Sequence, residues 1–412
     1  MADVTVLDVL LYDQPIGTLT RVGGDRILFA FNDDYIADEN RLVLGLGFKD
    51  QFGELITGFK PTQTRVMPFF ANLLPEGHMR AYLAERAGVN PEREFFLLWV
   101  LGRDLPGAIT IAPADGEEWP DDVDDHGDDD HDDDQRRENA LRFSLAGVQL
   151  KFSAINEASG GLTIPARGVG GSWIVKLPSR EFAGVPENEF SMMTLARLVG
   201  IDVPPVRLID LDEIRNLPEG IGALEGQALA IERFDRLPDG ESVHIEDFAQ
   251  VFGVYPDRKY KIGNARSIAT VIGAEAQETD IAEFIRRLTF NTLIGNADMH
   301  LKNWSLIYPD RRHAALAPAY DFVSTIPYIR DSGAALNVSR TKRFDEYSAN
   351  ELSHLAAKAR LPEKLVLDTA RETVALFHEH WQREKGNLPL GAAVIEAIEA
   401  QLKIVPIASV TG

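Results

Sequence analysis

The feature that most constrains this chain is an apolar helical stretch that ends in a short polar loop. Residues 281–294 place apolar side chains at helical spacing, and Gly295 predicts the end of that helix. A polar run follows it. Residues 304–308 then alternate as a strand does, and residues 316–321 predict its hairpin partner. We therefore expect a helix, a polar loop and a hairpin, in this order.

The spacing of polar residues in this region suits phosphoryl transfer. Asp298 and Asn303 are separated by four residues, so one short loop can present a carboxylate to a substrate hydroxyl and an amide oxygen to a magnesium ion. Asp321, after the hairpin, can hold the same metal against the phosphates of a nucleotide. Protein kinases arrange these parts in the same order. An alternative stays open, in which Asp298 caps a helix and Asn303 fills a turn.

Composition limits the chemistry further. The chain has 412 residues, which exceeds a single core and predicts two or three domains. Because it has no cysteine, disulfides, thiol nucleophiles and cysteine-held iron–sulfur clusters are excluded, and a metal must be held mainly by oxygen or histidine. No segment approaches the roughly 20 apolar residues of a membrane span, and the N-terminus has no signal-like pattern. We expect a cytoplasmic protein with no membrane partner.

The acidic charge is concentrated in one segment. The formal net charge is -22, and residues 115–138 hold fourteen acidic residues against two arginines, which leaves only -10 for the rest of the chain. Such a segment repels itself and cannot bury enough apolar area to offset the entropy of ordering. We expect residues 113–140 to form a disordered linker. The overall charge also argues against direct binding of nucleic acid.

The chain before this linker predicts a unit of its own. Residues 3–35 alternate apolar and polar positions around turn signals, which predicts a small antiparallel sheet. Helical patterns follow at residues 78–87 and 91–100, and the unit closes near Ala112. Residues 1–112 are therefore expected to form the first domain.

Strand patterns return after the linker. Residues 141–154, 171–177 and 228–234 predict strands, and residues 187–199 predict a helix. These elements suit a small lobe, residues 141–240, that covers a nucleotide.

Helical patterns dominate from residue 241 to the end. The last two predicted helices cover residues 363–384 and 392–404, and Pro362 suits the start of the first because proline is tolerated in an opening turn. Residues 241–412 are therefore expected to form a helical catalytic lobe that contains the polar loop.

Lys176 lies near the end of an apolar strand, where burial of an unpaired ammonium would be costly. Nucleotide phosphates are the functional candidate for its partner, with Glu189 on the next helix as the carboxylate that orients the lysine. The alternative is an edge-strand lysine whose ammonium extends into solvent.

Two further segments indicate a nucleotide site more weakly. Residues 142–152 resemble two strands joined by a tight turn at Gly147, but this turn has one glycine where protein-kinase loops have three. Residues 228–236 form an apolar strand that breaks into charge, as a hinge does beside an adenine edge. A core strand followed by a surface turn explains the second segment equally well.

Together these segments resemble the HipA family of bacterial serine/threonine kinases, the toxins of type II toxin–antitoxin pairs. The resemblance rests on residues 144–151, 173–177, 188–189, 232–236, 296–303 and 320–321. Residues 17–19 and 69–77 are similar to the domain that precedes the kinase core in this family. The resemblance implies an α+β, protein-kinase-like two-lobe fold with a small N-terminal β-rich subdomain and a mainly helical C-terminal lobe. The acidic residues 115–134 depart from the family pattern.

The resemblance also implies roles for individual residues. Asp298 would be the catalytic base, and Asn303 and Asp321 would hold Mg²⁺. Ser144 matches a serine that family members phosphorylate on themselves, which silences the enzyme. The residues implied at ATP are Ser144, Gly147, Lys151, Lys176, Glu189, Glu232, Phe234, His300 and Lys302.

The implied reaction is transfer of the γ-phosphoryl group of ATP to a protein serine or threonine. The implied substrate is an aminoacyl-tRNA synthetase, whose modification halts translation. The implied partner is a HipB-like helix-turn-helix antitoxin, through which operator DNA would mainly be bound.

Two other classes of function stay open from the sequence. A small-molecule kinase of the aminoglycoside-phosphotransferase type uses a similar loop. An inactive corepressor that acts with a DNA-binding antitoxin is the non-enzyme alternative, and it is disfavoured because Lys176, Asp298, Asn303 and Asp321 are all present.

Overall fold

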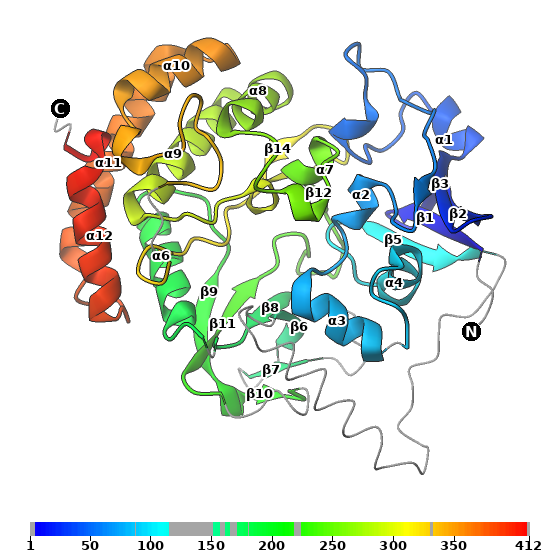
Figure 1. Cartoon of the computed structure of the whole chain (residues 1–412), viewed down its shortest axis with the longest axis horizontal. Coiled ribbons are helices and arrows are strands. Elements are labelled where there is room, and N and C mark those ends of the chain that lie inside the picture. The colour runs from blue at the N-terminus through cyan, green and yellow to red at the C-terminus, as the bar shows by residue number, and fades with distance from the viewer. Residues whose placement is uncertain are drawn as a thin grey trace.

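The structure is a computed structural model, and it describes residues 5–86, 88–114, 151–156, 161–164, 171–179, 181–217, 224–329 and 333–409. Most of the expected linker, together with Ser144 and Gly147, lies outside the described residues. The N-terminal sheet, the second sheet and the helical part lie around a common centre (Figure 1).

The N-terminal region contains an antiparallel sheet. Its strand order is β4-β3-β2-β1-β5. The strands are β1 (Val6–Leu11), β2 (Gln14–Val22), β3 (Arg26–Phe31), β4 (Thr62–Gln63) and β5 (Ile109–Pro113). Leu7, Val9 and Leu11 alternate into the core on β1, as the sequence pattern predicts for a sheet with one covered face.

Short helices accompany this sheet. They are α1 (Asp33–Ala37), α2 (Pro68–Ala71), α3 (Gly77–Arg86) and α4 (Glu94–Leu101). Phe29 and Phe70 lie in a cluster of edge-to-face rings that fills the space between sheet and helices. The predicted helices at 78–87 and 91–100 correspond to α3 and α4, with small shifts at their ends.

A second sheet has the strand order β10-β7-β6-β8-β11-β9. Its strands are β6 (Lys151–Asn156), β7 (Leu162–Thr163), β8 (Trp173–Lys176), β9 (Val206–Asp210), β10 (Ile214–Arg215) and β11 (Gln227–Glu232). Helix α6 (Val185–Leu198) packs against β9 and β11. The predicted strands and helix are therefore found here, although β11 ends at Glu232 rather than at residue 234, and residues 141–150 lie outside the described part of the chain.

The C-terminal region is mainly helical. Its helices are α7 (Phe248–Val251), α8 (Ala265–Glu275), α9 (Glu278–Ile294), α10 (Ala349–Ala359), α11 (Glu363–Glu384) and α12 (Ala392–Ile404). Helix α11 packs along α9, and Phe290, Phe377 and Trp381 are fully buried between them and their neighbours. The predicted bounds of α11 and α12 are confirmed. In Figure 1, α10, α11 and α12 lie on the side opposite the N-terminal sheet, whereas α7 lies beside α2.

Single-turn 3-10 helices connect several elements. They are η1 (Leu46–Phe48), η3 (Leu211–Glu213), η4 (Pro256–Arg258), η5 (Leu301–Asn303), η6 (Phe344–Glu346) and η7 (Pro406–Ser409). None of the helices in the described ranges has the length and apolarity that crossing a membrane requires.

A small sheet lies within the helical region. Strands β12 (His244–Asp247), β13 (Ser305–Tyr308) and β14 (Ala315–Leu316) pair in that order. The hairpin of β13 and β14 was predicted, but the strand expected over residues 316–321 is wrong beyond Leu316. Pro318 has no backbone N–H to continue the ladder, so pairing stops there.

Two buried contacts join the N-terminal region to β12. The ring of His244 donates a hydrogen bond from Nε2 to the Leu44 carbonyl at 2.7 Å. The carboxylate of Glu246 accepts hydrogen bonds from the backbone N–H of Leu46, at 2.8 Å, and from the hydroxyl of Tyr308. Burial raises the pKa of Glu246 to about 7.

A buried ion network joins the same region to the segment after β11. Arg233 pairs with Asp104 at 3.0 Å and with Asp235 at 2.9 Å, and Arg236 pairs with Asp104 at 3.0 Å. The Gly107 N–H donates to Asp235 at 2.9 Å. Because each charge is compensated, this network fixes the segment that was interpreted as a hinge against the N-terminal region.

Candidate active site

Gly295 ends α9 and starts the loop of residues 295–303, here called the Asp298 loop. Gly295 has a φ of 66°, and a Cβ added there would lie 2.4 Å from the Ile326 side chain. Only glycine fits this combination of left-handed backbone and close contact. The predicted helix end is therefore confirmed, and the loop leaves α9 in a defined direction.

Asn296 connects the Asp298 loop to the segment that carries Asp321. Its side-chain oxygen accepts a hydrogen bond from the Asp298 N–H at 3.0 Å. Its amide nitrogen donates to the Asn291 side chain at 2.8 Å and to the Asp321 carbonyl at 3.3 Å. The buried side-chain amide of Asn296 therefore fixes the backbone of Asp298 and that of Asp321 relative to each other.

Asn303 closes the loop at the end of η5. Its amide nitrogen donates to the Asp298 carbonyl at 3.0 Å. Since the nitrogen is used in this bond, the side-chain oxygen of Asn303 is the atom available to a cation. Asp298 caps neither neighbouring helix, because Gly295 is the C-cap of α9 and His300 is the N-cap of η5, whereas Asn303 does bond within the turn.

Lys176, Glu189 and Asp321 meet in a buried group. The Lys176 ammonium, on the interior strand β8, lies 2.5 Å from the Glu189 carboxylate on α6 and also contacts the Asp321 carboxylate. Lys151 lies farther from Asp321, at 3.9 Å. Because Lys176 is only 5% exposed, the alternative of an edge-strand lysine extended into solvent is wrong.

The ion pairs determine the charge states of Lys176 and Asp321. Burial would lower the pKa of Lys176, but Asp321 and Glu189 raise that pKa above its ordinary value. Burial would likewise raise the pKa of Asp321, but Lys151 and Lys176 hold that pKa well below its ordinary value. At neutral pH the site therefore presents a fixed ammonium and an ionised carboxylate. Asp321 itself has a φ of 58°, a conformation that is uncommon outside glycine and recurs at functional sites.

Tyr260 contacts the expected catalytic base directly. Its hydroxyl donates a hydrogen bond to the Asp298 carboxylate at 2.5 Å. Burial raises the pKa of Asp298, the bond from Tyr260 opposes this rise, and the charge of Asp321 adds to it. Sequence reasoning missed Tyr260 because it lies 38 residues before Asp298 and belongs to none of the motifs.

His300 and Lys302 point to surroundings of different kinds. His300 is buried and meets the edge of the Tyr260 ring, with 4.9 Å between ring centroids. Burial and the charge of Lys259 lower the pKa of His300 to about 3, so the ring is neutral at physiological pH. The Lys302 ammonium lies 2.8 Å from Glu76 in the N-terminal region, so its charge is engaged away from the group around Lys176.

Glu76 holds a second lysine as well. Its other oxygen lies 2.9 Å from the ammonium of Lys259, the residue before Tyr260. Burial would raise the pKa of Glu76, but Lys302 and Lys259 lower it to about 2. The sequence contained Glu76 in a segment similar to the family's N-terminal domain, but no spacing indicated that it contacts the Asp298 loop.

The expected hinge lies beside the Asp321 segment. Glu232 ends β11, and its N–H donates to the Pro205 carbonyl at 2.9 Å. Phe234 stacks on Tyr320, with 5.8 Å between ring centroids. The Tyr320 hydroxyl also donates to the Lys302 carbonyl at 2.8 Å. Phe234 is thus linked through one ring to both Asp321 and the Asp298 loop.

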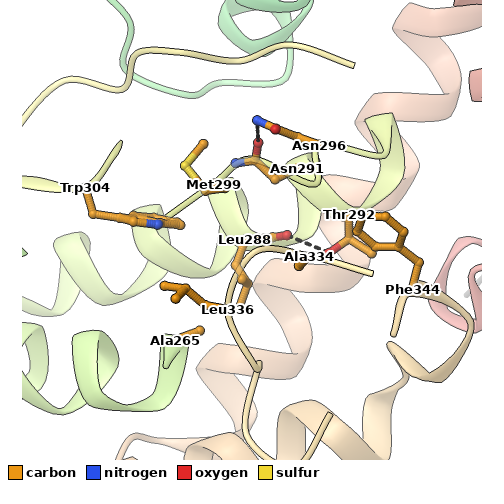
Figure 2. Close-up of a pocket in the computed structure, with 10 residues that line it drawn as sticks. All are labelled: Ala265, Leu288, Asn291, Thr292, Asn296, Met299, Trp304, Ala334, Leu336 and Phe344. Carbon is orange, nitrogen blue, oxygen red and sulfur yellow. Dashed lines mark hydrogen bonds between the residues drawn. The ribbon is translucent and has the colours of Figure 1, made fainter. Parts of the chain in front are cut away.

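A small cavity lies behind the Asp298 loop. Figure 2 shows mainly apolar side chains around it, with Asn296 and Asn291 bonded to each other at one edge. Its lining residues are Ala265, Leu288, Asn291, Thr292, Asn296, Met299, Trp304, Ala334, Leu336 and Phe344. Because none of the lysines or carboxylates described above lines this cavity, we do not assign a nucleotide to it.

Comparisons with known proteins agree with the architecture. The family model described as the HipA N-terminal domain matches residues 7–112, and the model described as the HipA-like C-terminal domain matches residues 143–381. The chain is 62% identical over 402 residues to the protein named "Putative kinase Y4dM" of Sinorhizobium fredii, with 97% of each chain covered. It is 26% identical over 350 residues to the serine/threonine-protein kinase toxin HipA of Shewanella oneidensis, with 74% of each covered.

A solved structure supports the fold. A chain in the Shewanella oneidensis complex of HipA, HipB and operator DNA matches with a TM-score of 0.73 and 21% identity, over 97% of this chain and 98% of that one. The expected α+β architecture, with a β-rich N-terminal part and a helical C-terminal part, is confirmed.

Proposed function

This chain belongs to the HipA family, and we propose that it is an ATP-dependent protein serine/threonine kinase of the HipA toxin type. The observation that carries the proposal is the arrangement of Asp298, Asn303 and Asp321. Asn303 is bonded to the Asp298 carbonyl, and Asn296 bonds both Asp298 and Asp321. This arrangement holds a base and two oxygen donors together, as phosphoryl transfer requires.

Asp298 is proposed as the base that accepts the hydrogen bond of the substrate hydroxyl. Its raised pKa brings it closer to the range in which a carboxylate takes up a proton during the reaction. Lys176, held by Glu189 in a buried position, would stabilise negative charge on the phosphates. Catalysis would then rest mainly on positioning and electrostatics.

Magnesium fits the oxygen donors of this site. The side-chain oxygen of Asn303 and the carboxylate of Asp321 would hold it, and when bound it supplies positive charge that neutralises the phosphates. Within the described ranges no cluster of three or more histidine, aspartate or glutamate side chains forms a metal cage. A site with few protein ligands is what magnesium uses beside a nucleotide.

The remaining nucleotide contacts are proposed from the family resemblance. Glu232 and Phe234 would meet the adenine, and Lys151, close to Asp321, would face the phosphates. His300 and Lys302 are proposed at the same nucleotide, with Lys302 keeping its ion pair with Glu76. Ser144 and Gly147 would belong to the loop that covers it, with Ser144 as the self-phosphorylated residue.

The proposed partner is a HipB-like antitoxin, which would carry the contact with operator DNA. The support is that a chain of the same fold is found with HipB and operator DNA in Shewanella oneidensis. The proposed protein substrate is an aminoacyl-tRNA synthetase, carried over from the family resemblance.

The test is a transfer assay with radiolabelled ATP, magnesium and purified aminoacyl-tRNA synthetases, run beside free alcohols and aminoglycosides. We expect phosphate on a serine or threonine of a synthetase, and Asp298→Asn should reduce that transfer more than about a hundredfold while ATP binding persists. Transfer to small alcohols alone would instead assign the chain to the small-molecule kinases. ATP binding without any transfer would support the corepressor.

A further inference from the structure

Tyr260 occupies one of the two oxygens of the Asp298 carboxylate, Oδ1, which is an atom that an acceptor hydroxyl could use. Its hydroxyl donates to the Asp298 carboxylate at 2.5 Å, and a substrate hydroxyl must donate to the same carboxylate before its oxygen can attack phosphorus. The phenol remains protonated, because burial and the negative charge of Asp298 raise the pKa of Tyr260 far above neutrality. It is therefore a permanent donor at physiological pH.

The position of Tyr260 is supported from two sides. Its ring meets the edge of the buried His300 ring, and the preceding Lys259 is paired with Glu76 at 2.9 Å. Glu76 also pairs with Lys302 inside the Asp298 loop at 2.8 Å. The Glu76 carboxylate therefore holds both the segment that contains Tyr260 and the Asp298 loop against the N-terminal region.

Tyr260 nevertheless remains accessible. Its side chain is 48% exposed, in contrast with His300, which is 7% exposed. A side chain that is fixed at its base and exposed along its ring can turn away without disturbing the core. Displacement by an incoming protein segment is therefore feasible, whereas a water molecule offers too little contact to replace both the hydrogen bond and the ring packing.

We propose that Tyr260 selects the acceptor of the transfer, because it competes with water for Oδ1 of Asp298 and yields this oxygen to a protein hydroxyl. The proposal rests on the proposed kinase function. In the suppressed reaction, the oxygen of water would bond to the γ-phosphorus of ATP and the bond to the bridging oxygen of ADP would break. The water proton would pass to Asp298, and the products would be ADP and inorganic phosphate.

The test compares phosphate release from ATP and magnesium, in the absence of any added protein acceptor, for the full chain and for Tyr260→Phe. The substitution removes one hydroxyl and keeps the ring against His300. We expect release of inorganic phosphate to rise by about tenfold, a change comparable to the loss of one hydrogen bond to a charged group, with unchanged affinity for ATP. Unchanged or slower release would overturn the proposal.

A matched control is Tyr255→Phe. Tyr255 lies on the same segment, but its hydroxyl donates to the Val66 carbonyl of the N-terminal region at 3.2 Å. This variant should release phosphate at the parental rate. An equal rise in both variants would show a general loosening of the segment and would count against Tyr260 as the selecting residue.

The Asp298→Asn variant distinguishes a failure of the kinase proposal from a failure of the acceptor proposal. If Asp298→Asn abolishes transfer while Tyr260→Phe changes nothing, the kinase proposal stands and the acceptor proposal fails. If Asp298→Asn leaves transfer intact, the base assignment fails and the acceptor proposal falls with it. Tandem mass spectrometry of peptides provides a last check, since phosphate on Tyr260 itself would make this residue a substrate and overturn its role as a selector.

Discussion

The ammonium of Lys302 lies 2.8 Å from the carboxylate of Glu76, so a residue inside the Asp298 loop is paired with the N-terminal region. The same ammonium donates to the Asn72 carbonyl at 3.1 Å. The region before the linker therefore supports the loop that carries the proposed base. The N-terminal region thus has a physical role at the candidate site.

Glu76→Gln should reduce transfer by roughly ten- to a hundredfold, because small displacements of a catalytic loop are costly to the rate. The amide cannot compensate both lysines, so Lys302 and Lys259 lose their common anchor. Thermal stability should fall modestly, because the lowered pKa of Glu76 means that its two ion pairs stabilise the fold, while partial exposure of its side chain screens them. Measured kcat and melting temperature check this, with exposed Glu85→Gln on α3 as the control; an unaltered kcat would contradict the anchoring role.

The metal assignment predicts altered magnesium dependence in Asn303→Ala and Asp321→Asn. Asn303→Ala removes an oxygen donor, and Asp321→Asn replaces a charged donor by a neutral amide oxygen, at an ion that keeps mostly water and phosphate oxygens as ligands. Calorimetric titration of ATP with and without magnesium should show a smaller difference in affinity for each variant. Asp321→Asn is preferred to alanine because it keeps a partner of similar shape beside the buried Lys176. A metal dependence equal to that of the parent would remove Asp321 from the metal site.

Glu246 predicts a pH-dependent stability. Burial raises its pKa from an ordinary 4.5 to about 7, so the folded protein binds more protons than the unfolded chain between these values. Its contribution to the free energy of unfolding therefore falls as pH rises through this window. Glu246→Gln keeps an acceptor for the Leu46 N–H. Near pH 8 it should raise the melting temperature by roughly 2 °C, which corresponds to about 1 kcal/mol in the free energy of unfolding, and near pH 5 it should change the melting temperature little. Equal destabilisation at both pH values would refute this account.

Ser144 lies outside the described residues, and its role remains a prediction. A phosphate there would add close to two negative charges beside those of the nucleotide, and their repulsion should expel the loop and weaken ATP binding. Ser144→Ala should still bind ATP but lose the self-applied phosphate. Mass spectrometry after incubation with ATP and magnesium decides between outcomes: a stoichiometric phosphate elsewhere, with Ser144 unmodified, would refute self-inactivation through this serine.

Local sequence signals predicted the parts of the fold that depend on neighbours in the chain. The bounds of α11 and α12 follow from apolar periodicity, and the end of α9 follows from Gly295. The strand predicted over residues 316–321 ends at Leu316, because Pro318 has no backbone N–H to continue the pairing. A proline after a short strand is a local signal, so the sequence itself indicates where this strand ends.

The sequence by itself determined the residue types of the site and their order along the chain. The cost of burying Lys176 required an anionic partner, and Glu189 meets it in the structure at 2.5 Å. Only the tertiary structure decided that Tyr260 bonds to Asp298 and that Glu76 pairs with Lys302. These contacts join segments that are remote in sequence, and they depend on how whole domains pack. The spacing of residues within a motif carries no information about which distant side chains will lie against that motif in the folded chain.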